Sequence, residues 1–209
     1  MKEIYLTKNN NPIKISHFPG YDRYLYKNLM ARFERNKVSI PDNITLITVA
    51  DDDTVAYDRA MLIRQLNKSK INFVNPAKHV DVYPWVNNRK IELIINALKR
   101  ITTEYCLILD SLDVTINSDL SNIIELFQTY NKEILFNATN FKYPNVDVDI
   151  IENREELYGR YCYLNAGCCI GLTSSLLKFY EDTLENLNNC SKDDPYWESE
   201  QYHIRKTFS

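Results

Sequence analysis

Two aspartates at the end of an apolar run are the residues of this sequence best suited to chemistry. The run from Tyr105 to Asp110 reads as a buried strand, and Asp113 follows Asp110 by three positions. Strand side chains alternate between faces, but a turn at the strand end lets two such carboxylates converge on one point. Converging carboxylates repel each other unless a cation lies between them, and Mg²⁺ and Mn²⁺ take oxygen ligands of this kind. The pair therefore predicts a metal and diphosphate site. The competing interpretation is a helix start, because Asp and Ser are good helix caps.

Strand and helix patterns alternate along the chain around this pair. The alternation predicts an α/β fold, with a mainly parallel central sheet flanked by helices. Ligands in open sheets of this kind bind beyond the carboxyl ends of the strands, which is where Asp51 and Asp110 fall. Strands are expected at 44–50, 70–74, 105–110 and 133–137, helices at 54–67, 90–101, 121–130 and 174–188, and an apolar segment at 161–172.

The chain has 209 residues, which fits one large domain. Residues 1–43 read as an N-terminal extension packed on a main domain of residues 44–209. The 25 basic and 28 acidic residues are well mixed and give a net charge of −3, so no basic stripe indicates a nucleic-acid partner. The N-terminus has no apolar run of signal-peptide length, and no run approaches the roughly 18 apolar residues of a membrane span. These features predict a cytoplasmic protein without a membrane segment.

Several common nucleotide and hydrolase motifs are absent from the sequence. No GxGxxG follows the first predicted strand, and neither a GxxxxGKS/T loop nor a GxSxG turn occurs anywhere. The histidines His17, His79 and His203 are scattered along the chain. A Rossmann dinucleotide site, a P-loop and a hydrolytic triad are therefore disfavoured.

The remaining motifs together resemble the glycosyltransferase A fold, a Rossmann-like fold of nucleotide-diphospho-sugar transferases. The closest likeness is to the glycosyltransferase domain of lysyl hydroxylases and related procollagen glycosyltransferases, and it covers roughly residue 44 to the C-terminus. The matching blocks, in order, are Ile47-Thr-Val-Ala50 followed by Tyr57, Lys90 at a helix start, Leu109-Asp-Ser-Leu-Asp-Val114, Ile134-Leu-Phe-Asn-Ala138 with Tyr143-Pro144, and Tyr163-Leu-Asn-Ala-Gly167 with Ile170-Gly171.

The sequence departs from the family pattern at several points. Tyr143 stands where the family has Trp, and Cys168 stands where it has a second glycine. The family's Asp-Asp-Gln run appears only as Glu200-Gln201. The family also supplies a third metal ligand, a histidine, well downstream of that run. His203 is the nearby histidine of this chain and the candidate for that role; otherwise the chain is a fragment or its metal site is completed differently.

The resemblance implies a metal-dependent glycosyltransferase that uses a nucleotide sugar, with UDP as the expected nucleotide and a hydroxyl group as acceptor. Asp110, Asp113 and His203 are the expected ligands of Mn²⁺ or Mg²⁺. One of Asp193, Asp194 and Glu200 is the expected base that deprotonates the acceptor. The donor is expected to contact Val49, Ala50, Asp51, Lys90, Ser111, Tyr143, Asn165 and Gly167.

Two other classes of function remain open from the sequence. A degenerate module of the same fold would bind a sugar nucleotide without turning it over. A nucleotidyltransferase of similar architecture also places carboxylates around a metal, although a glycine-rich phosphate loop would then be expected after the first strand. Asp51-Asp52-Asp53 offers no glycine at that point.

Overall fold

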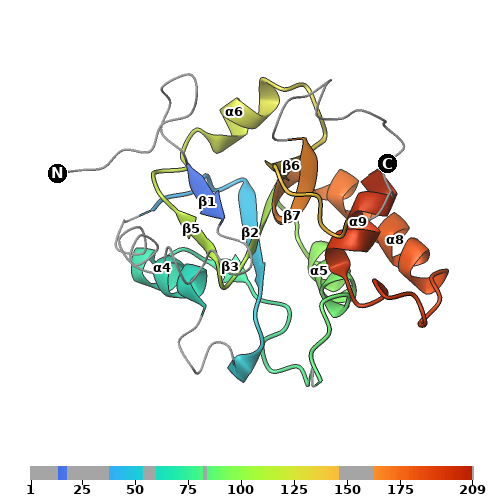
Figure 1. Ribbon diagram of the computed structural model, residues 1–209. Coiled ribbons are helices and arrows are strands. Elements are labelled where there is room, and N and C mark those ends of the chain that lie inside the picture. Colours follow the sequence, from blue (N-terminus) through green and yellow to red (C-terminus); the bar gives the residue numbers. More distant parts are fainter. Residues whose placement is uncertain (1–13, 18–37, 54–59, 82–83, 146–161, 209) are drawn as a thin grey trace.

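The computed structural model describes residues 14–17, 38–53, 60–81, 84–145 and 162–208 (Figure 1). Tyr57 and the first half of the helix predicted at 54–67 lie outside the described residues. The helices and strands are β1 (Ile15–His17), β2 (Ile44–Val49), α4 (Met61–Ser69), β3 (Phe73–Val74), α5 (Arg89–Leu98), β4 (Tyr105–Asp110), β5 (Val114–Ile116), α6 (Ile123–Gln128), β6 (Ile134–Thr139), β7 (Tyr163–Leu172), α8 (Thr173–Asn188) and α9 (Glu200–Phe208).

The central sheet has five strands in the order β3-β2-β4-β7-β6. Strand β2 pairs in parallel with β3 and β4, whereas β7 is antiparallel to both β4 and β6. The prediction of a mainly parallel sheet is therefore not confirmed, because the sheet is mixed. That prediction assumed a helical crossover before every strand, and the apolar pattern of residues 161–172 carries no information about strand direction.

Helices cover both faces of the sheet, and the alternation of strand side chains decides which residues meet them (Figure 1). On one face, Ile47 and Ile108 pack with apolar residues of α5 and α8. On the other face, Leu46 and Leu107 pack with α4, β5 and α6. Strands β2 and β4 are buried on both faces, so the sequence shows nearly continuous apolar runs there rather than strict alternation.

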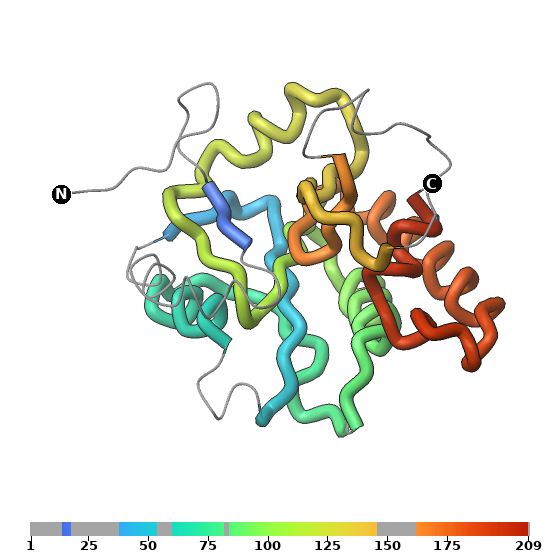
Figure 2. The backbone as a smooth tube through the Cα atoms, in the orientation of Figure 1, coloured from blue at the N-terminus to red at the C-terminus, as the bar shows by residue number. Residues whose placement is uncertain are grey.

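A second, two-stranded sheet lies against the main one and joins distant parts of the chain. Strand β1 pairs antiparallel with β5, with Ile15 opposite Ile116 and His17 opposite Val114. The blue trace of β1 in Figure 2 runs beside the yellow-green trace of β5, although about 100 residues separate them in sequence. The buried Gln65 of α4 holds β5 through both backbone groups of Ile116, at 2.6 and 2.9 Å. The small sheet is thus tied to the helix layer.

The C-terminal segment ends in a helix, α9. It packs on α8 and carries the buried side chains Glu200, His203 and Arg205. Among the helices that the structure describes, none is both long enough and apolar enough to span a bilayer.

Candidate metal and donor site

Strands β2 and β4 end side by side and bring the predicted aspartates to the edge of the sheet. Val49 is the register partner of Asp110, so both strands stop at the same level. The chain then turns, and Ser111 donates a hydrogen bond of 3.0 Å to the carbonyl of Val49. The turn is short because β5 begins at Val114, directly after Asp113. This geometry lets the two carboxylates converge, as the spacing in the sequence predicts.

A histidine from β1 meets both aspartates. The register of β1 against β5 places His17 opposite Val114 and therefore next to Asp113. Its Nε2 lies 3.4 Å from Oδ1 of Asp113 and 3.6 Å from Oδ2 of Asp110. The His17 side chain is only 5% exposed. Burial lowers the pKa of His17, but the carboxylates of Asp113 and Asp110 outweigh it, so the pKa lies above its usual value.

The three side chains can share one metal ion. One ligand atom from each of His17, Asp110 and Asp113 lies within 4.8 Å of the others. An octahedral ion that is about 2.1 Å from its ligands separates neighbouring ligand atoms by about 3 Å and opposite ones by about 4.2 Å. The distances from Nε2 to the carboxylates, 3.4 and 3.6 Å, fall between these limits. The donor set of two carboxylates and one imidazole fits a divalent cation and leaves other coordination positions open.

A glycine in β7 provides the space for this cluster. A Cβ atom on Gly167 would clash with the ring of His17 and lie 2.7 Å from Oδ2 of Asp110. Any side chain there would push the ligands away. Asn165 lies two residues before Gly167 in the same strand, and its Oδ1 accepts a hydrogen bond of 3.0 Å from the backbone N–H of Gly167. Both predicted donor residues of β7 therefore lie beside the metal cluster.

Lys90 links Asp110 to a third carboxylate. Its Nζ lies 2.6 Å from Oδ1 of Asp110 and 3.0 Å from Oε2 of Glu200. The pKa of Lys90 is raised: burial lowers it, but the two carboxylates more than compensate. Burial raises the pKa of Asp110, yet Lys90 and His17 together hold it below its ordinary value. Burial raises the pKa of Glu200 to about 7, with Lys90 opposing the rise and Asp110 adding to it.

Gln201 fixes the backbone of β7 next to the site. Its Oε1 accepts a bond of 2.7 Å from the N–H of Ala166, and its Nε2 donates one of 2.7 Å to the carbonyl of Leu164. The pairing of β6 with β7 is irregular in this region, with Phe136 opposite Cys169 but Asn137 opposite Asn165. Gln201 therefore replaces sheet hydrogen bonds on either side of Asn165 and helps to set the position of that residue.

The structure also places the predicted residues at the end of β2. Ala50 is buried, and the side chain of Asn75 bonds both its N–H and its carbonyl, at 3.1 and 2.8 Å. Asp51 follows at the start of the next turn. The hydroxyl of Ser111 is used by the carbonyl of Val49. Val49, Ala50, Asp51 and Ser111 thus share one edge of the sheet with the metal cluster.

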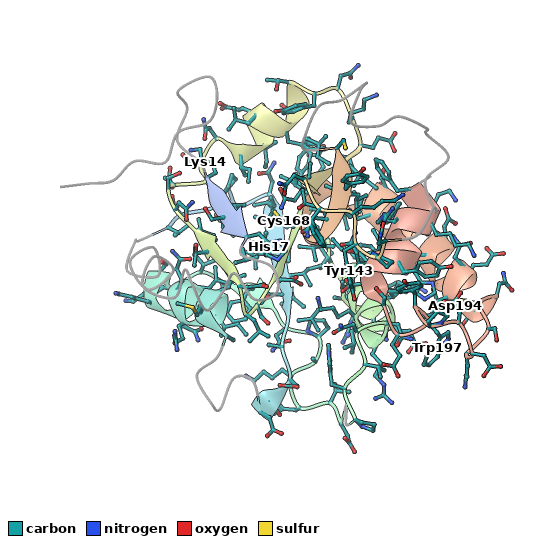
Figure 3. The ribbon with its side chains drawn as sticks, in the orientation of Figure 1. Lys14, His17, Tyr143, Cys168, Asp194 and Trp197 are labelled. Carbon is teal, nitrogen blue, oxygen red and sulfur yellow. The ribbon has the colours of Figure 1, made fainter. Side chains whose placement is uncertain are left out.

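Other predicted residues lie apart from this cluster. Figure 3 shows Asp194 and Trp197 well away from His17. Asp193 is exposed, and Asp194 accepts a bond of 2.8 Å from the N–H of Tyr196 in the turn before α9. Of the three candidate bases, Glu200 alone is recorded in contact with Lys90 in the described part of the chain.

His203 is buried in α9, whereas Tyr143 is exposed on a loop. His203 is fully buried, and its Nε2 lies 2.9 Å from the carbonyl of Trp197. It is not part of the His–Asp cluster found among the described residues. Burial lowers the pKa of His203. The Tyr143 side chain is 58% exposed, and the next carbonyl, that of Pro144, accepts a bond of 2.6 Å from the buried Arg205. Tyr143 is thus presented at the surface by an anchored loop.

Two residues of this site, His17 and Gln201, could not be predicted from the sequence alone. Ile15 and His17 alternate with Lys14 and Ser16, which is a strand signal. That signal predicts a short strand but not its partner, so it does not bring His17 to Asp113. Gln201 was noted only as part of an acidic run, and its backbone contacts depend on how α9 packs against β7.

No curated protein matches the chain. A family model described as the PLOD GT domain, the glycosyltransferase domain of lysyl hydroxylases, matches residues 40–200, which is well over half of the chain. The matched residues include both aspartates of the cluster, Lys90, the β7 segment and Glu200. The chain therefore belongs to the lysyl hydroxylase glycosyltransferase domain family.

Proposed function

We propose that the protein transfers a sugar from a UDP-sugar donor to a hydroxyl acceptor, in a reaction that depends on Mn²⁺ or Mg²⁺. The observation that carries the proposal is the convergence of Asp110, Asp113 and His17 at the end of β4, in a chain of this glycosyltransferase family. When bound, a divalent ion offsets the charge that develops on the diphosphate as the glycosidic bond breaks.

The predicted donor residues have three roles in this proposal. Val49, Ala50, Asp51 and Ser111 form the edge that receives the nucleotide, and Tyr143 offers a ring for stacking. Lys90 holds Asp110 in place through the 2.6 Å ion pair and keeps positive charge beside the diphosphate. Asn165 and Gly167 lie beside the cluster, where the amide of Asn165 would orient a sugar hydroxyl.

Glu200 is the base that we favour, because its Oε2 lies 3.0 Å from Nζ of Lys90, which also contacts Asp110. A base must be mostly ionised yet able to hold a proton, which is most efficient when its pKa is near the working pH. Burial raises the pKa of Glu200 to about 7, which meets that condition. Asp193 and Asp194 remain as alternatives for an acceptor that approaches from the α9 side.

The test is release of UDP from a panel of UDP-sugars, measured with Mn²⁺ and again with EDTA. Release should require the metal and should be lost in Asp113→Asn. Asp182→Asn is the matched control, because Asp182 is a surface carboxylate paired with Lys178 at 3.0 Å. Equal release with and without metal would contradict the proposal.

The same preparation distinguishes the other classes of function. UDP binding by calorimetry without release from any donor would indicate a module that binds sugar nucleotides but does not turn them over. Formation of a UDP-sugar and pyrophosphate from UTP and a sugar phosphate would indicate a nucleotidyltransferase.

A further inference from the structure

One residue of the metal cluster comes from outside the part of the chain that matches the family. The match covers residues 40–200, and His17 precedes it. Asp110 and Asp113 lie within it. The nitrogen of the cluster is therefore supplied by β1, an element that lies outside the matched residues.

We propose that His17 is a metal ligand of this protein and that it gives the site its preference for Mn²⁺ over Mg²⁺. The inference rests on the proposed function only in taking Asp110 and Asp113 as ligands of the same ion. Three observations carry it: the burial of the ring, its position between the two carboxylates, and the space that Gly167 leaves for it.

The ring is held in position by a chain of contacts that reaches into the core. Gln65 fixes Ile116 of β5 through two hydrogen bonds. Strand β5 pairs with β1, and Asn117 bonds Ser16 of β1 with its side chain at 2.6 Å and Lys14 with its backbone at 2.7 Å. The Lys14 carbonyl and the Ser16 hydroxyl, on either side of Ile15, are therefore both held by Asn117, and the pairing of β1 with β5 places His17 beside Asp113.

The chemistry of the ring predicts which ion is preferred. Mg²⁺ binds oxygen ligands and keeps its waters, whereas imidazole is a ligand of transition metals. Two carboxylates alone would serve either ion. A nitrogen ligand favours Mn²⁺, so the selectivity of the site should depend on His17, while the carboxylates set the affinity for both ions.

The position of the ring also has a simpler explanation, which the experiment must separate from ligation. A protonated His17 would form ion pairs with Asp110 and Asp113 and would occupy the place of a cation. Removing the ring would then relieve competition, and the affinity for metal would rise or stay the same. Ligation predicts the opposite change.

The first measurement is titration of the full chain with Mn²⁺ and with Mg²⁺, each in the presence of UDP, for the wild type and for His17→Gln. The variant should bind Mn²⁺ at least about tenfold more weakly, because loss of even an outer-shell partner costs roughly 10–100-fold in metal affinity. Its affinity for Mg²⁺ should fall less. His79→Gln is the control, because His79 forms an exposed pair with Asp52 at 3.1 Å, outside the cluster.

The second measurement does not use the His17 variant, so it stands even if His17→Gln does not fold. Electron spin echo spectra of bound Mn²⁺ should show coupling to a histidine nitrogen, and the coupling should change when histidine carries ¹⁵N. The Nε2 of His203 is already taken by Trp197, and His79→Gln should keep the signal. Bound Mn²⁺ without nitrogen coupling, or unchanged Mn²⁺ selectivity in His17→Gln, would overturn the proposal.

UDP release is recorded on the same samples and separates the two proposals. Metal-dependent release without nitrogen coupling would leave the glycosyltransferase function standing and remove His17 from the metal. Nitrogen coupling without release from any donor would keep the ligand and remove the proposed reaction.

Discussion

Replacing Glu200 with Gln should change how the stability of the metal-free protein depends on pH. Burial raises the pKa of Glu200 from 4.5 to about 7 on folding. A carboxyl whose pKa rises on folding holds its proton more tightly in the folded state. Its contribution to stability is therefore complete below pH 4.5 and is lost as the pH rises through about 7. Gln keeps the shape of the protonated acid but cannot ionise, so the variant should lack this loss.

The size of the effect follows from the two pKa values. At about 1.36 kcal/mol for each pH unit between 4.5 and about 7, the loss amounts to roughly 3 kcal/mol. The Glu200 side chain is 9% exposed, so solvent screens it little. The assay is urea unfolding in EDTA at about pH 5 and about pH 8.5. The free energy of unfolding of the wild type minus that of the variant should be lower at the higher pH by about 2.5 kcal/mol, because part of the loss has already occurred at about pH 5.

Other titrating groups cancel in this difference. The pKa of His17 is also raised, so its contribution falls with rising pH, but it falls in both proteins. The pKa of Asp110 is lowered, so its contribution is lost only in acid. Glu198→Gln is the control, because it removes an exposed carboxyl two positions away. An unchanged difference between about pH 5 and about pH 8.5 would show that Glu200 remains ionised throughout and would refute the reasoning.

Three further outcomes are expected. Asp113→Ala should abolish UDP release but shift the melting temperature of the EDTA-treated protein by less than about 4 °C, or about 1 kcal/mol; a large loss of stability with retained release would make Asp113 structural. Asn165→Ala should reduce the difference in affinity between a UDP-sugar and UDP in calorimetry, whereas equal losses for both ligands would contradict a role in sugar binding. His203→Ala should lower the free energy of unfolding by roughly 1–3 kcal/mol, because the ring is buried and bonded to Trp197. The same variant should bind Mn²⁺ with unchanged affinity, and weaker binding would indicate that His203 is a metal ligand.

The local sequence predicted those parts of the fold that local physics determines. The strands β2 and β4 follow from apolar runs that end in polar residues, and α5 follows from apolar residues at helical spacing. The convergence of Asp110 and Asp113 also follows locally, because a strand end and a three-residue spacing are enough. The direction of β7 could not be predicted in this way, since pairing direction depends on the route of the chain between strands.

Only part of the candidate site could be predicted, because some of its residues are brought together by segments that are far apart in the sequence. Lys90 and Asn165 were placed at the donor site by resemblance, and the structure brings Lys90 to Asp110 and Asn165 to Gly167. His17 was missed because its role depends on the pairing of β1 with β5, which are about 100 residues apart. His203 was favoured because it is close in sequence to Glu200, but on α9 its ring turns toward Trp197.

The charges of the cluster connect metal binding to the proposed base. Asp110, Asp113 and Glu200 supply three negative charges when ionised, and Lys90 supplies one positive charge. Whether His17 is neutral or protonated, the metal-free cluster carries excess negative charge, and Glu200 is the carboxyl whose pKa rises to about 7 in response to burial and to Asp110. A divalent ion bound to the two aspartates would balance the remaining charge, so the repulsion of Glu200 by Asp110 would weaken. Ionisation of Glu200 at neutral pH is therefore expected to follow metal binding, which would make the base available when the donor and its metal are in place.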